Sequence, residues 1–169
     1  MSISSRTATS LPPTVNLHLV AYCNMKCAYC YARFEDERAA RRLPVEDLIA
    51  VIDQLADHHV RRLTFAGGEP TLHPHLATLL AHASHRGIVT SVVSNGEFLT
   101  DDWLALHGPH LRWITLSIDS VDGPTANALG RRTLRQVGTH VDRIVAVCAR
   151  VHAWNARRPR ARRIRLKLN

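Results

Sequence analysis

The sequence predicts an α/β fold in which about five parallel strands form part of a (β/α) barrel. Its 169 residues, 46% hydrophobic and 21% charged, suit one globular core. Short apolar runs with strand periodicity alternate with longer helical patterns, which is typical of βα units and a parallel sheet. Polar motifs follow four of the predicted strands. Since loops after parallel strands meet at one edge, we expect the chemistry there.

The first predicted strand begins at Thr14, where apolar Val15, Leu17 and Leu19 alternate with polar Asn16 and His18. Residues 1–13 are rich in Ser and Thr and contain no long apolar run, so we expect a disordered segment there and a single core over 14–169. No later run reaches the length of a membrane span, which predicts a cytoplasmic protein without membrane contact.

Helices and strands then alternate to the end of the chain. Pro44, with acids directly behind it, opens a helix, and Gly87 closes the next one. The predicted helices are 44–55, 74–85, 100–107 and 133–154, and the remaining strands are 61–66, 88–94, 113–119 and 164–168.

Alternation along the strands predicts a barrel wall with two different faces. Helices should cover the apolar set, which is Leu63, Phe65, Ile114, Leu116, Ile118, Ile164, Leu166 and Leu168. The opposite set should line a wet interior: Asn16, His18, Arg62, Thr64, Thr115, Ser117, Asp119, Arg165 and Lys167. This interior predicts a cavity for a polar, anionic ligand. Alternatively, Arg165 and Lys167 lie on a solvent-facing edge strand, where their charges prevent it from pairing with a strand of another chain.

Three of the four cysteines, Cys23, Cys27 and Cys30, fall within eight residues after the first strand. Clustered cysteines in a cytosolic chain favour metal over disulfides. Three thiolates can bind zinc or an iron-sulfur cluster, but a closed zinc site needs a fourth protein ligand, whereas a cluster can leave one iron open. Cys148 lies in an apolar helical run and is predicted to be a buried, inert thiol. The histidines show no paired metal-binding spacing, although His18 points into the predicted interior.

A Gly67-Gly68-Glu69-Pro70 motif follows the second strand, 37 residues after Cys30. Glycines permit close approach of the backbone to a ligand and should leave amide groups free to bind it, and Glu69 could receive a cationic amine. The chain also carries a net charge of +8, of which seven charges lie in the last thirteen residues. This local charge predicts either a phosphate- or RNA-facing segment or a solvated loop, and not a uniformly basic nucleic-acid binder.

The cysteine spacing, with Tyr29 before the last cysteine, and the Gly-Gly-Glu-Pro motif resemble those of radical S-adenosylmethionine (SAM) enzymes. Six further segments resemble viperin and its prokaryotic relatives: Val15-Asn-Leu-His-Leu, Phe65-Ala-Gly-Gly-Glu-Pro, Val93-Ser-Asn-Gly, Leu116-Ser-Ile-Asp-Ser, Leu129-Gly-Arg131 and Leu166-Lys-Leu-Asn169. The resemblance covers about residues 14–169. It implies a radical SAM barrel with about five of six strands present, incomplete at its C-terminus.

The resemblance also implies an activity and a set of site residues. A 5′-deoxyadenosyl radical from SAM would take hydrogen from C4′ of a ribonucleoside triphosphate, and loss of the 3′-hydroxyl as water would give a 3′-deoxy-3′,4′-didehydro nucleotide, an antiviral chain terminator. Metal ligands would be Cys23, Cys27 and Cys30. SAM would contact Gly67, Gly68, Glu69, Asn95, Ser117 and Arg131. The nucleotide would contact Asn16, Arg62, Arg131 and Lys167, since cations suit phosphates.

Two other functions stay open. The chain could be a radical SAM enzyme that acts on a peptide or another small molecule, or a non-catalytic iron-sulfur or RNA-binding fragment with the basic segment from Arg157 as its contact. The viperin-like hypothesis requires an electron donor such as flavodoxin or ferredoxin, and it predicts no stable complex with nucleic acid. Because the resemblance implies a sixth strand and a C-terminal tail beyond these residues, we expect either a fragment of such a barrel or a shortened relative that binds the cluster and SAM without converting a nucleotide.

Overall fold

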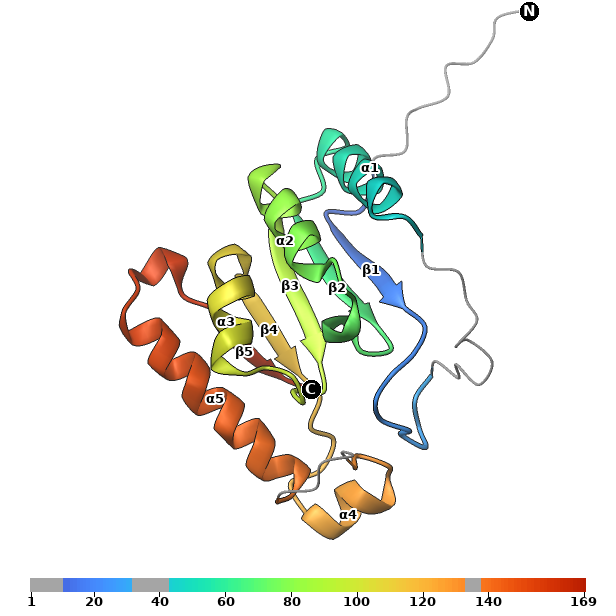
Figure 1. Ribbon diagram of the computed structural model, residues 1–169, viewed down its shortest axis with the longest axis vertical. Coiled ribbons are helices and arrows are strands. Elements are labelled where there is room, and N and C mark those ends of the chain that lie inside the picture. The colour runs from blue at the N-terminus through green and yellow to red at the C-terminus, as the bar shows by residue number, and fades with distance from the viewer. Residues whose placement is uncertain (1–10, 32–42, 133–137) are drawn as a thin grey trace, which may run out of the picture.

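The computed structural model describes residues 11–31, 43–132 and 138–169, where five parallel strands form one sheet in the order β1-β2-β3-β4-β5 (Figure 1). The strands are β1 (Thr14–Val20), β2 (Arg62–Gly67), β3 (Val89–Ser94), β4 (Trp113–Leu116) and β5 (Arg165–Leu168). The helices are α1 (Val45–Asp57), α2 (Leu76–His85), α3 (Asp101–His107), α4 (Gly123–Ala128) and α5 (His140–Ala156). Short 3-10 turns occupy Pro70–Leu72, Gly108–His110 and Arg160–Arg162. The predicted α/β fold with five parallel strands is confirmed.

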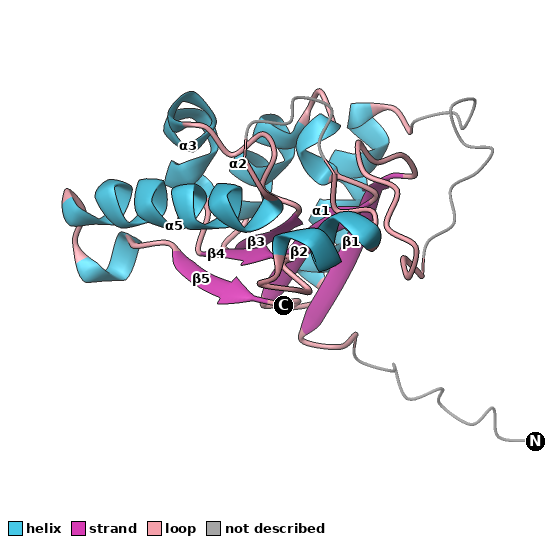
Figure 2. Ribbon diagram, turned by 90° about the horizontal axis from the view of Figure 1, so that it is seen from below, coloured by secondary structure: helices cyan, strands magenta, loops and turns pink. Residues whose placement is uncertain are grey.

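Helices α1, α2, α3 and α5 lie on one side of the sheet, as Figure 2 shows. The predicted outer residues Leu63, Phe65, Ile114 and Leu116 are fully buried under this layer, and their alternating neighbours on the other face are exposed or half-buried. The predicted division into two faces is therefore confirmed. Leu168 departs from it, because it ends the edge strand β5 and is 54% exposed.

Helix α5 begins later than the pattern predicted. The predicted start at 133 lies in 133–137, outside the described residues, and the structure begins α5 at His140. Gly138 has a φ of +76°, which is incompatible with a continuous right-handed helix. Thr139 then caps the helix: its hydroxyl accepts the Asp142 N–H at 3.2 Å, and the Asp142 carboxylate accepts the Thr139 N–H at 2.7 Å. This reciprocal capping box sets the first turn.

The segment after β4 also differs from the prediction. The strand was expected to reach Asp119, but it ends at Leu116, and Asp119 has a φ of +60°, which turns the chain away from the sheet. A short helix that the pattern analysis missed, α4, follows. Its signals are Asp122, whose carboxylate accepts the Thr125 N–H at 2.9 Å, and Pro124 in the first turn.

Only the end of the predicted disordered segment is described. The Pro13 carbonyl accepts the Arg61 and Arg62 N–H groups at 2.9 and 3.1 Å and so attaches the chain to the start of β2, while residues 1–10 lie outside the described ranges. Among the helices that the structure describes, none combines the length and the apolar character that crossing a membrane requires.

Candidate active site

The four predicted motifs lie in the loops that follow β1, β2, β3 and β4, at the shared C-terminal edge of the sheet (Figure 1). Hydrogen bonds connect these loops directly. The loop after β2 is bonded to the loops after β1 and β3, and the loop after β4 is bonded to the end of β3. The structure therefore brings the motifs together as the strand order predicts.

Gly67 and Gly68 let two loops run side by side. A Cβ atom on Gly67 would stand 2.5 Å from the Val20 carbonyl oxygen, and one on Gly68 would stand 2.0 Å from the Tyr22 carbonyl oxygen. Gly68 N–H donates to Val20 O at 2.7 Å, and Glu69 N–H donates to Tyr22 O at 2.9 Å. The expectation that these amides are free for a ligand was wrong, because they hold the cysteine loop to the sheet.

Glu69 is 1% exposed, and its carboxylate accepts four hydrogen bonds. Oε1 accepts from Thr71 N (3.2 Å), Thr71 Oγ1 (2.6 Å) and Ser94 Oγ (2.9 Å), and Oε2 accepts from Asn95 N (2.9 Å). Burial raises the pKa of this carboxyl, and the four donors oppose that shift. The side chain predicted to receive an amine from SAM is thus an internal connection between the loops after β2 and β3.

Asn95 extends this connection to the cysteine loop. Its Nδ2 donates to Asn24 Oδ1 at 2.7 Å and approaches Cys23 Sγ at 3.8 Å, while its Oδ1 accepts the Glu97 N–H at 3.0 Å. The side chain is 4% exposed. Asn95, predicted to contact SAM, thus lies beside a predicted metal ligand in this structure.

The cysteine loop is also held from its far side by the chain after α4. Ala28 N–H donates to Leu129 O at 3.0 Å, and a Cβ atom on Gly130 would stand 2.1 Å from the Lys26 carbonyl oxygen. Gly130 has a φ of +84°, so glycine is favoured there both by backbone conformation and by space. The segment directly after the missed helix α4 thus holds one side of the cysteine loop.

Arg131 is 9% exposed and joins the loop after β4 to the cysteine loop. Its guanidinium forms an ion pair with Asp119, and Nε donates to the Tyr29 hydroxyl at 2.9 Å. Burial, and then the hydrogen bond with Asp119, raises the pKa of the Tyr29 hydroxyl. Arg131, predicted for both SAM and substrate, has its charge neutralised by Asp119 in this structure.

The donor set suits an iron-sulfur cluster. Cys23, Cys27 and Cys30 are free thiols on one loop, and Met25 N–H donates to Cys23 Sγ at 3.4 Å. Burial raises the pKa of Cys23 and Cys27, so metal binding there must displace protons. In the described part of the chain, no three His, Cys, Asp or Glu side chains are arranged to hold a single metal ion. Soft thiolates on a short loop are the ligands that such clusters use.

The remaining predicted site residues lie at the C-terminal edge and along the strands. Ser117, predicted to contact SAM, lies at that edge, where its N–H donates to Ser94 O at 3.0 Å and its carbonyl accepts from His140 Nε2 at 2.8 Å. Asn16 and Lys167 are exposed on the uncovered face, in register with Thr64 and Thr115 respectively. Arg62 is exposed at the N-terminal start of β2. Asn16, Arg62 and Lys167 therefore share the uncovered face that strand alternation predicts, and their contact with a nucleotide stays a prediction.

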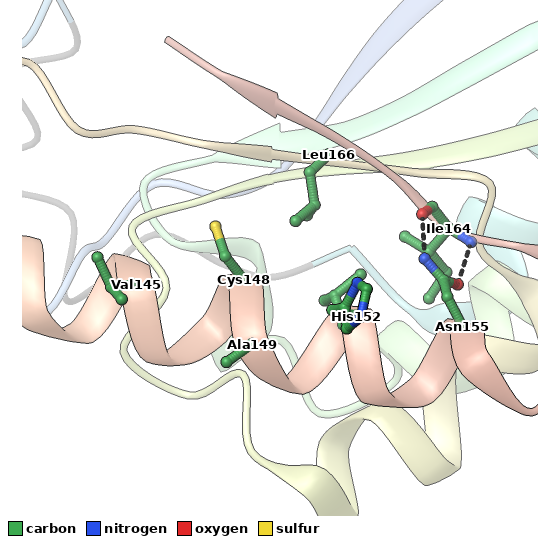
Figure 3. A pocket seen from close by; sticks show the side chains of 8 residues that line it. Val145, Cys148, Ala149, His152, Asn155, Ile164 and Leu166 are labelled. Atoms are coloured by element: carbon green, nitrogen blue, oxygen red, sulfur yellow. Dashed lines mark hydrogen bonds between the residues drawn. The ribbon is translucent and has the colours of Figure 1, made fainter.

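Cys148 lies in a different place, on α5. Figure 3 shows it beside a groove of about 560 Å³ between this helix and β5, lined also by Val145, His152, Ile164 and Leu166. Burial raises the pKa of its thiol. None of the three clustered cysteines is among the residues that line this groove.

The alternation pattern did not reveal Asn24, Gly130 or Trp113 as site residues. Asn24 and Gly130 act through contacts between distant loops, which no local pattern signals. Trp113 carried a signal, because it occupies an inward position at the start of β4, next to Ile114 on the buried face.

Most of this chain is similar to known protein sequences. Residues 17–153 match the family model described as Radical SAM superfamily. The chain is 40% identical over 136 residues to an S-adenosylmethionine-dependent nucleotide dehydratase of Flammeovirga pacifica, a match that covers 78% of this chain and 46% of that protein. An S-adenosylmethionine-dependent nucleotide dehydratase RSAD2 of Oncorhynchus mykiss is 30% identical over 145 residues, 83% of this chain and 40% of that protein. The chain thus spans less than half the length of these curated relatives.

Solved structures show the same fold at low sequence identity. Streptococcus suis SuiB bound to S-adenosylmethionine superposes with a TM-score of 0.71 at 19% identity, covering 95% of this chain and 34% of SuiB. Native anSMEcpe with bound AdoMet gives a TM-score of 0.69 at 16% identity, covering 92% of this chain and 42% of that protein.

Proposed function

Because the chain belongs to the Radical SAM superfamily, we propose that it holds a [4Fe-4S] cluster and SAM and dehydrates a ribonucleoside triphosphate to its 3′-deoxy-3′,4′-didehydro analogue. The 40% identity to a protein named as a nucleotide dehydratase supports this substrate class. The relatives are longer than this chain, so the activity is proposed for the chain as part of such a barrel.

One observation carries the choice of an anionic substrate. None of the five described strands contains Asp or Glu, whereas their uncovered face presents Arg62, Arg165 and Lys167. Within the described ranges none of these three cations forms an ion pair, while Asp119 at the edge is already neutralised by Arg131. A cationic face without carboxylates favours phosphate, with which guanidinium and ammonium groups form strong charge-assisted hydrogen bonds.

Each group of site residues would have its own role in this reaction. Cys23, Cys27 and Cys30 would hold the cluster, which with SAM supplies a 5′-deoxyadenosyl radical, with flavodoxin or ferredoxin as the class of electron donor. The hydrogen bonds of Glu69 and Asn95 fix the neighbouring loops. Since the buried Glu69 carboxylate already accepts four hydrogen bonds, backbone oxygens of the Gly67-Gly68 turn would be the acceptors for the SAM amine. The cations of the open face would orient the nucleotide.

The test is an anaerobic assay of the full reconstituted chain with reductant and SAM. CTP, UTP, GTP and ATP are offered in parallel, and 5′-deoxyadenosine and a nucleotide lighter by one water are measured. We expect one nucleotide to stimulate 5′-deoxyadenosine formation and to give the dehydrated product.

Two variants make the result specific. Cys27→Ala should abolish cluster binding and 5′-deoxyadenosine formation, and Cys148→Ala, which removes a thiol from the α5 groove, should leave both in place. If 5′-deoxyadenosine forms at the same rate with and without each nucleotide, the substrate assignment is overturned but the cluster assignment stands. A chain that binds the cluster but cleaves no SAM would overturn the proposal that these residues are catalytic by themselves.

A further inference from the structure

Trp113 occupies an unusual place on the open face of the sheet. It is the first residue of β4, and because the next residue, Ile114, is fully buried under the helices, Trp113 projects from the opposite face. It lies in register with Arg165 on β5 and with Ser91 on β3. Ser91 is small and its hydroxyl is bonded to Thr64 at 2.7 Å, so β3 leaves room for the indole to extend over it.

The indole contacts two arginines that come from distant parts of the chain. The guanidinium carbon of Arg62, two strands away on β2, is 5.4 Å from the ring centroid, and that of Arg165 is 5.2 Å from it. Both distances are within the range of cation–π contacts. The two guanidinium carbons are therefore no more than 10.6 Å apart, the sum of these distances.

The shared aromatic face is the contact that the structure gives to both exposed guanidinium groups. Within the described residues neither the Arg62 nor the Arg165 guanidinium is among the ion pairs or hydrogen-bond donors, so their N–H groups can face a ligand. We propose that Trp113 is a positioning residue that holds Arg62 and Arg165 in one row, so that together they bind the polyphosphate of the substrate. This inference rests on the proposed nucleotide function.

The position along the strands fits an elongated ligand. Trp113 and Arg165 begin their strands, whereas the cysteine loop lies beyond the strands' other ends. From residue 113 to Ser117 the backbone covers about 13 Å at about 3.3 Å per residue. A nucleotide lying along the sheet would place its phosphates at the arginines and its sugar toward the cysteines.

The test compares ligands that differ only in phosphate number. In the reconstituted full chain, Trp113→Leu should raise the KM for the triphosphate about tenfold, the effect expected when both cation–π contacts are lost, and leave kcat unchanged. The KM for the corresponding monophosphate should change by less than about twofold, because one phosphate cannot engage both arginines. Trp113→Phe keeps an aromatic face and should recover most of the affinity.

Calorimetric binding of inorganic tripolyphosphate separates this inference from the proposed reaction. Tripolyphosphate binding that weakens in Trp113→Leu and Arg165→Gln, but not in the equally charge-changing Arg162→Gln, supports the site even if no nucleotide is dehydrated. In an Arg165→Gln background the Trp113→Leu change should cost less than it does alone, because it acts through the arginine. Equal losses for mono- and triphosphate, or additive effects in the double variant, would overturn the proposal.

Discussion

The buried carboxylate of Glu69 gives the sharpest test of how this site is built. Glu69→Gln keeps the shape of the side chain and replaces one oxygen by an NH₂ group. Three donors converge on Oε1 and one, the Asn95 N–H, on Oε2, so the least costly arrangement puts the NH₂ against Asn95. That arrangement leaves two donors facing each other at a residue that is 1% exposed.

A buried unsatisfied donor costs about 1–3 kcal/mol, and loss of the charge weakens the remaining bonds, so we expect the free energy of unfolding to fall by about 2–4 kcal/mol. For a chain of this size that corresponds to a decrease in Tm of roughly 5–15 °C. Urea unfolding followed by circular dichroism measures the change. Glu46→Gln, at an exposed position in the first turn of α1, is the matched control and should change stability by less than about 0.5 kcal/mol.

The competing role of Glu69, direct binding of the SAM amine, predicts a different outcome. If Glu69→Gln has near-normal stability but a much weaker Kd for SAM, the carboxylate is a ligand contact and our interpretation of its four hydrogen bonds is wrong.

Three further predictions concern the same loops. Gly130→Ala should lower the iron bound per chain and destabilise the fold, because the new Cβ would meet the cysteine loop at 2.1 Å; Gly87→Ala, also at positive φ but with no atom within 4 Å, should cost only about 1 kcal/mol and keep full iron content. Asn95→Ala should lower the reduction potential of the reconstituted cluster in a redox titration, because it removes a donor 3.8 Å from Cys23 Sγ; an unchanged potential would refute that contact. Burial lowers the pKa of His140, so the unfolded chain takes up a proton before the folded one, and stability should fall as pH drops below about 6.5, by up to ~1.4 kcal/mol per pH unit; a slope that persists in His140→Gln would assign it to other groups.

The local patterns predicted most helices and strands correctly, because an element that is buried on one face repeats its apolar residues at a regular spacing in the sequence. Leu63 and Phe65, and Ile114 and Leu116, alternate with polar residues, and the helices cover the apolar set as expected. The errors fall where one residue changes the backbone. Gly138 precedes the later start of α5, Asp119 turns the chain after β4, and the Asp122 cap opens the missed α4.

The fold class, the cysteine loop and the common edge at which the motifs meet could all be predicted from the residues, because the hydrophobic period of strands and helices is a local property. The roles of individual polar groups depended on contacts made in the folded chain. Glu69, Asn95 and Arg131 are each of a type that can bind a ligand, but contacts to Ser94, Asn24 and Asp119 occupy them. The Trp113 ring contacts Arg62 and Arg165 only when strands β2, β4 and β5 lie in one sheet. A buried polar group must find its partners wherever the folded chain supplies them, and that choice is made between residues far apart in sequence.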